Sequence, residues 1–100
     1  MDIINQPTLI ERFAEKPQYL DHEANYEKCG VCLKQMIQYQ VCKEFVLKGQ
    51  ITNEYVPEME QEVNRRWQES ELYLEIQKLK SSDKTLDEAI AIMESRGYYP

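Results

Sequence analysis

The chain has 100 residues, 42% of them apolar, with three Gly and four Pro. This is the size of one domain spanning 1–100, and so few turn-forming residues argue against a β-sandwich or a disordered chain. The net charge of −6 disfavours direct nucleic-acid binding, because phosphate contacts need clustered Lys and Arg. We see no signal peptide and no apolar run long enough to span a membrane, and the odd cysteine count favours reduced thiols, so we expect a cytoplasmic protein.

The first predicted element is a short helix over residues 8–16. Thr8 can cap it, and Glu11 lies three residues later, which is the spacing of a capping box. Pro17 should end it, because the residue before a proline is pushed out of the helical region.

A long helix is predicted over residues 21–48, with Asp21 as N-cap and Gly49 at its end. At 100° per residue its apolar side chains form one broad face and a second group outside it. A surface this wide predicts a central helix with neighbours on several sides. The face comprises Tyr26, Cys29, Leu33, Met36, Ile37 and Leu47, and the second group Val41, Cys42, Phe45 and Val46.

A second long helix is predicted over residues 53–80, with Asn53 as its cap and Pro57 in its first turn. Its apolar residues form two stripes on nearly opposite sides. A helix with two apolar faces usually has two neighbours, and one of them is either the following helix or another subunit. The first stripe is Met59, Val63, Trp67 and Leu74; the second is Leu72, Ile76 and Leu79.

The last predicted helix begins at the capping box formed by Thr85 and Glu88 and ends at Gly97. The short loop 81–84 before it predicts an antiparallel hairpin with the preceding helix. Together these elements predict an all-α fold, a small helical bundle of three main helices plus a short N-terminal helix.

The three cysteines and the single histidine form a nominal zinc set, namely Cys29, Cys32, Cys42 and His22. On one straight helix Cys29 and Cys32 share a side, but Cys42 lies about 15 Å along the axis from Cys32 and His22 about 10 Å from Cys29. One ion could bind all four only if the chain broke near Gly30 or later, and no Pro, Gly or turn cluster marks a break between Val31 and Cys42.

A redox site is not favoured either, because thioredoxin-like C-x-x-C motifs follow a strand, whereas helix is expected on both sides here. The interpretation we favour is that the thiols pack as small hydrophobes, with no cofactor. A zinc site remains the alternative if the chain turns at Gly30.

No active site is evident from the residues, because one histidine and three isolated glycines supply neither a catalytic triad nor a phosphate loop. We therefore expect a non-enzymatic protein that binds another protein and itself, as a homo-oligomer, without contact to nucleic acid or membrane. The candidate interface is the second stripe with its neighbouring tyrosine, namely Leu72, Tyr73, Ile76 and Leu79. The alternatives are a metal-binding module that uses the cysteines and an acidic inhibitor that mimics nucleic acid and blocks a basic partner surface.

Overall fold

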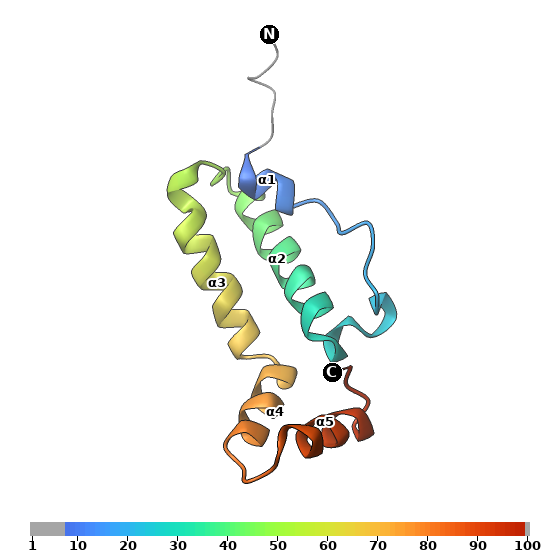
Figure 1. Ribbon diagram of the computed structural model, residues 1–100. Helices are drawn as coiled ribbons and strands as arrows, with labels where there is room; N and C mark the ends of the chain where they lie inside the picture. The colour runs from blue at the N-terminus through green and yellow to red at the C-terminus, as the bar shows by residue number, and fades with distance from the viewer. Residues whose placement is uncertain (1–7, 100) are drawn as a thin grey trace.

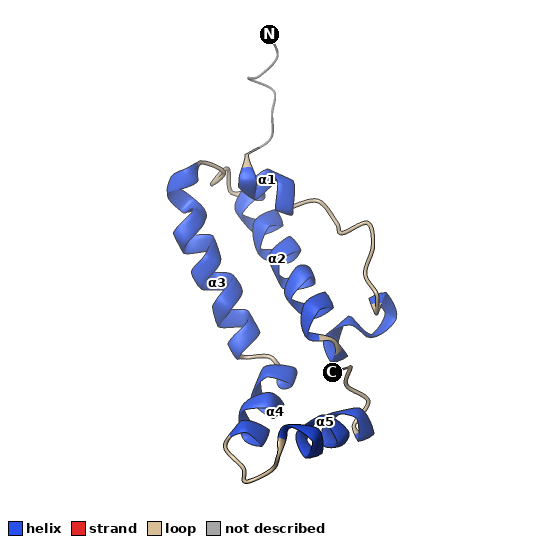
Figure 2. Cartoon of the chain, in the orientation of Figure 1, coloured by secondary structure: helices blue, strands red, loops and turns tan. Residues whose placement is uncertain are grey.

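The structure, a computed structural model, describes residues 8–99. Within this range the chain is helical and forms no β-strand, which confirms the predicted all-α fold (Figure 2). None of these helices combines the length and hydropathy needed to cross a lipid bilayer. The elements are α1 Leu9–Phe13, η2 Glu23–Lys28, α2 Gly30–Leu47, η3 Asn53–Tyr55, α3 Val56–Gln68, α4 Glu71–Lys80 and α5 Leu86–Ser95, where η denotes a 3-10 helix.

Helix α2 is the centre of the fold, as its wide apolar surface predicts. It packs against α1, α3 and η2, and α3 runs back along it after the turn at η3 (Figure 1). Its buried side chains face more than one neighbour because they surround most of the helix. They are Cys32, Leu33, Ile37, Val41, Cys42 and Phe45. Leu47 is an exception to the prediction, since it is 78% exposed.

Helix α1 confirms the predicted capping box but is shorter than predicted. The Thr8 side chain accepts a hydrogen bond from the Glu11 amide, and the Glu11 carboxylate accepts one from the Thr8 amide. Ile10, 1% exposed, anchors this helix in the core formed with α2. One turn is too short to be stable alone, so α1 depends on that burial.

The prediction of one helix over residues 21–48 is wrong at its start, because α2 begins at Gly30. Cys29 has extended backbone (φ −121°, ψ 123°), and the preceding residues form the irregular 3-10 helix η2, in which Asn25 is non-helical. The Tyr99 amide donates a hydrogen bond to the Lys28 carbonyl over 2.8 Å. This contact with the far end of the chain stabilises the extended backbone, a tertiary effect that local helix propensity does not reveal.

The prediction of one helix over residues 53–80 is also wrong, because the chain breaks between α3 and α4. Ser70 has extended backbone and caps α4, its hydroxyl accepting from the Tyr73 amide and donating to the Trp67 carbonyl. The two opposed apolar stripes therefore belong to two helices. Leu74 does not join the first stripe, since it is 50% exposed. The main helices thus number four rather than three in residues 8–99.

Helix α5 starts at the predicted Thr85–Glu88 capping box and is followed by Gly97 with φ 86°, a conformation that favours glycine. The predicted antiparallel hairpin is wrong, because α5 runs crosswise to α4 at the end of the molecule where α2 starts (Figure 1). An ion pair between Arg96 and Glu75 joins α5 to α4.

The cap at Ser70 is open to a direct test. We expect Ser70→Ala to lower the free energy of unfolding by about 1 kcal/mol, because the Tyr73 amide loses its acceptor at the start of α4. Urea denaturation followed by circular dichroism measures this change. The control is Ser95→Ala at the end of α5, whose hydroxyl only donates to the Ile92 carbonyl; it should stay within ~0.5 kcal/mol of wild type. Equal stability of both variants would contradict a break at Ser70.

Candidate functional site

His22, Cys29 and Cys32 form a cluster of metal-ligating atoms at the start of α2. One ligand atom of each residue lies within 4.8 Å of the others, and the Cys32 Sγ lies 4.0 Å from the His22 Nδ1. Both thiols are buried and free, and the imidazole is half-buried. The structure therefore brings together three of the four residues of the predicted zinc set.

The extended backbone at Cys29 explains how these three side chains meet. Cys29 is the N-cap of α2 and Cys32 is its third residue, so their side chains converge as those of a capping box do. Because the chain leaves the helix direction at Cys29, η2 folds back and His22 reaches the same point. The helix is therefore interrupted at Cys29, one residue before Gly30, where a metal site required a break in the chain.

The C-terminal segment packs directly against this cluster. The rings of Tyr99 and His22 stack, with centroids 3.7 Å apart and planes inclined by 18°. Cys29 and Tyr99 also form an isolated parallel β-bridge, and the Asn25 side-chain amide donates to the Tyr99 hydroxyl over 3.4 Å. Tyr99 thus fixes both the backbone of Cys29 and the plane of the His22 ring.

Burial governs the protonation of the Cys32 thiol. It raises the pKa of Cys32, a hydrogen bond from the His22 backbone opposes the change, and the neighbouring Cys29 adds to it. A thiol that burial keeps protonated, as it does Cys32, binds a metal by releasing its proton.

Cys42 lies outside the cluster, as the helical rise predicts. It is about 15 Å along α2 from Cys32, is fully buried, and its Sγ lies 3.1 Å from the Sδ of Met59. Cys42 therefore links α2 to α3 in the main core, whereas Cys29 and Cys32 form a separate small cluster with Leu20.

The C-x-x-C motif has helical residues on both sides, as expected, with the 3-10 helix η2 before it and α2 after it. Cys29 itself, the first residue of the motif, has extended backbone. No strand-based βαβ unit surrounds it among the described residues, which form no strand.

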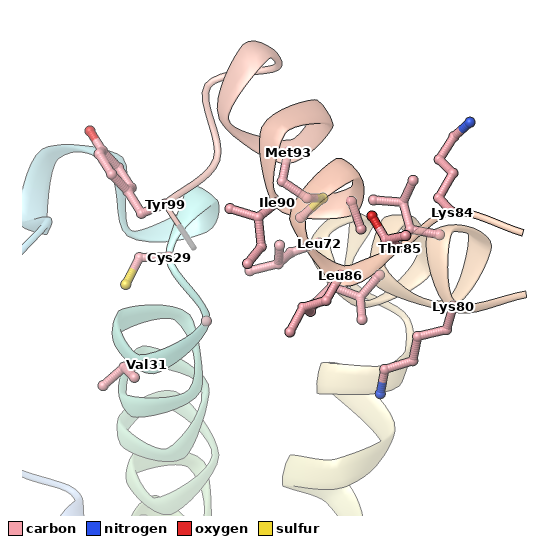
Figure 3. A pocket seen from close by; sticks show the side chains of 14 residues that line it. Cys29, Val31, Leu72, Lys80, Lys84, Thr85, Leu86, Ile90, Met93 and Tyr99 are labelled. Atoms are coloured by element: carbon pink, nitrogen blue, oxygen red, sulfur yellow. The ribbon is translucent and has the colours of Figure 1, made fainter. Parts of the chain in front are cut away.

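A groove of about 490 Å³ opens between the start of α2 and the α4–α5 pair (Figure 3). Its walls are apolar, and Lys80 and Lys84 stand at the end opposite Cys29 and Tyr99. The main apolar side chains are Leu72, Ile76 and Leu79 from α4 and Leu86, Ile90 and Met93 from α5. The groove and the cysteine cluster are therefore neighbours that share Cys29 and Tyr99.

The predicted interface residues are divided between this groove and the core. Leu72 is 2% exposed, and Ile76 and Leu79 are half-buried groove residues. Tyr73 lies elsewhere and packs edge-on against Trp67 with centroids 5.6 Å apart. Sequence reasoning missed Leu86, which is 76% exposed at the groove. The available signal was its place on one helix face with Ala89, Ile90 and Met93, at the spacing i, i+3, i+4 and i+7.

Glu62 of α3 is the centre of a network of ion pairs. Glu62 pairs with Arg65 and Arg66, and these arginines also hold Glu69 and Glu44. Hydrogen bonds from Arg65 and then Arg66 lower the pKa of Glu62 to about 2. This network joins α3 to α2. Glu44, Glu62 and Glu69 are therefore paired within the chain, whereas an acidic inhibitor would present its carboxylates to a basic partner.

Comparison with known protein families, with curated proteins and with solved structures finds no match to this chain. The function must therefore be argued from the chain's own residues.

The burial of Cys42 predicts a slow thiol. Burial raises its pKa to about 11, so at pH 8 almost none of it is thiolate, which is the reactive form. We expect iodoacetamide to modify Cys42 at least tenfold more slowly in the folded protein than in urea. Peptide mapping by mass spectrometry measures both rates, and equal rates would contradict the buried position.

The Glu62 network predicts a pH-dependent contribution to stability. Because the folded state lowers the pKa of Glu62 from 4.5 to about 2, its stabilising effect is complete above pH 4.5 and is lost as the pH falls toward 2. Glu62→Gln should therefore unfold at lower urea than wild type at pH 7, with the difference shrinking in acid. The control is Glu60→Gln on the exposed side of α3. A difference that is independent of pH would contradict the ion pairing.

Proposed function

We propose that this protein is a non-enzymatic protein-binding module that associates with a second copy of itself through the α4–α5 groove. The observation that carries the proposal is the groove itself, in which an apolar hollow stands beside a protruding leucine. Leu86 is 76% exposed and Val31 67% exposed at its edge. Adjacent exposed apolar side chains of this kind mark interaction surfaces on small proteins.

The chemistry of the groove favours binding over catalysis. Its lining offers Lys80, Lys84 and Thr85 at one end and Cys29 and Tyr99 at the other, with apolar side chains between them. An apolar centre with polar ends is the anatomy of a protein interface. A helix with apolar side chains at i, i+3 and i+4 fits such a groove.

A second copy is the occupant that this surface fits best, because the surface is self-complementary. The groove and the projecting side chain of Leu86 lie next to each other on this surface. The surface also carries the basic Lys80 and Lys84 next to the acidic first turn of α5, where Asp87 and Glu88 are exposed. In a two-fold dimer each patch meets its own copy, so a surface with both shapes and both charges can pair with itself.

The shape of the molecule supports the same proposal. Its radius of gyration is 16.7 Å, whereas a compact domain of 100 residues has ~13 Å. The α4–α5 end extends beyond the pair formed by α2 and α3 (Figure 1). Association through this end would cover apolar side chains that one copy leaves exposed.

Sedimentation of matched leucine variants tests the proposal. We expect wild type to approach twice its mass of 11.9 kDa with increasing concentration. Leu86→Glu should weaken the dimer at least tenfold, or by about 1.4 kcal/mol, because it places a carboxylate without a partner in the interface.

The control is Leu47→Glu, since Leu47 is equally exposed, at 78% against 76% for Leu86. It lies at the far end of α2, about 26 Å from Gly30 by helical rise, and should leave the dimer unchanged. A wild type that stays monomeric at roughly 1 mM, or a Leu86→Glu variant that associates as wild type does, would contradict the proposal.

A further inference from the structure

We propose that His22, Cys29 and Cys32 bind one zinc ion, with solvent in the fourth position. Thiolate sulfur and imidazole nitrogen are the ligands that zinc prefers in proteins. Three protein ligands and one open position are a known zinc coordination, in which two cysteines and one histidine occur together. The site is distinct from the proposed function, because it does not need the groove to be occupied.

The distances fit a tetrahedral ion after a small contraction. With Zn–S near 2.3 Å and Zn–N near 2.0–2.1 Å, tetrahedral ligand atoms lie about 3.5–3.8 Å apart. The cluster places its three ligand atoms within 4.8 Å of one another and the Cys32–His22 pair at 4.0 Å. The distances between the ligand atoms therefore need to shorten by less than about 1.3 Å to reach tetrahedral geometry. Small rotations of the side-chain torsions can supply this change without a change of rotamer.

The charge of the cluster also fits a divalent cation. Both thiols are buried, Cys29 at 8% and Cys32 at 2% exposure, next to the apolar Leu20. One thiolate here would carry an uncompensated charge into an apolar site, which is costly. Two thiolates with Zn²⁺ sum to zero, so the ion permits both cysteines to be deprotonated where they lie.

The imidazole is the feature that an ordinary cluster of packed thiols does not explain. Its ring is stacked on Tyr99 and turned so that Nδ1 faces the Cys32 sulfur. A neutral imidazole gains little from a thiol at 4.0 Å, which is at the limit for a sulfur hydrogen bond. A ring whose orientation is held by a neighbour is what metal sites use to place a histidine ligand.

Zinc at this position would connect three parts of the chain. His22 precedes η2, while Cys29 and Cys32 belong to the first turn of α2. Tyr99, which stacks on His22 and pairs with Cys29, carries the constraint to the segment after α5. Bound zinc should therefore stabilise the whole end of the molecule that contains the groove.

The test is zinc content, with each cysteine changed in turn. Protein purified under reducing conditions and incubated with ZnSO₄ should retain one zinc per chain after dialysis, measured by elemental mass spectrometry. Cys29→Ala, Cys32→Ala and His22→Gln should each bind zinc at least about tenfold more weakly. The matched control is Cys42→Ala, because it removes a thiol that the helix holds away from the site. Cys42→Ala should keep one zinc per chain if circular dichroism shows that this variant is folded. If Cys42→Ala does not fold, Cys42→Ser serves as the control instead.

Cobalt supplies a second readout that does not depend on stability. Co²⁺ bound in place of zinc should show sulfur-to-cobalt charge transfer and the intense visible bands of tetrahedral coordination, and Cys29→Ala should lose part of the charge transfer. Leu86→Glu should bind zinc as wild type does, so failure of the dimer and failure of the zinc site are distinguishable. Wild type without zinc at saturating ZnSO₄, a Cys29–Cys32 disulfide in the reduced preparation, or equal zinc loss in Cys42→Ala and Cys29→Ala would each overturn the proposal.

Discussion

The extended backbone at Cys29, paired with Tyr99, is the constraint on which the rest of this structure depends. The Tyr99 amide bonds to the Lys28 carbonyl, and this contact joins residues 71 positions apart in the chain. It sets the start of α2 and lets η2 fold back so that His22 meets both cysteines. It also holds the segment after α5 against α2, which forms one end of the groove. The candidate metal centre and the candidate interface therefore share one structural cause.

Helix α2 divides its cysteines between two environments. Near its start, Cys29 and Cys32 lie in a small cluster beside the half-buried imidazole of His22. Further along, Cys42 is sealed in the main core, where burial raises its pKa to about 11. Identical side chains thus differ in chemistry because the helical rise carries them to different neighbours. The cluster suits ligation of an ion, and the core position suits packing between α2 and α3.

The sequence was sufficient for the fold class, the two capping boxes and the central place of α2, because these follow from local hydrogen bonding and apolar periodicity. It did not reveal that α2 begins at Gly30, since that depends on Tyr99, and no local pattern encodes the contact. The break at Ser70 could have been found, because a serine before Glu71 is an ordinary N-cap signal and the apolar stripes change sides there. The helical rise correctly separated Cys42 from Cys32, while the position of His22 required the break at Cys29.

The contact between Tyr99 and Lys28 can be measured directly by amide hydrogen exchange. Near a chain terminus an amide without a partner exchanges at its intrinsic rate. If the Tyr99 amide donates to the Lys28 carbonyl, NMR should show it protected at least roughly tenfold, or by about 1.4 kcal/mol of opening free energy. Exchange of the Tyr99 amide at the intrinsic rate would contradict the account. The hydrogen bond from Tyr99 to Lys28 would then be absent, and it could explain neither the approach of His22 to the cysteines nor the position of α5.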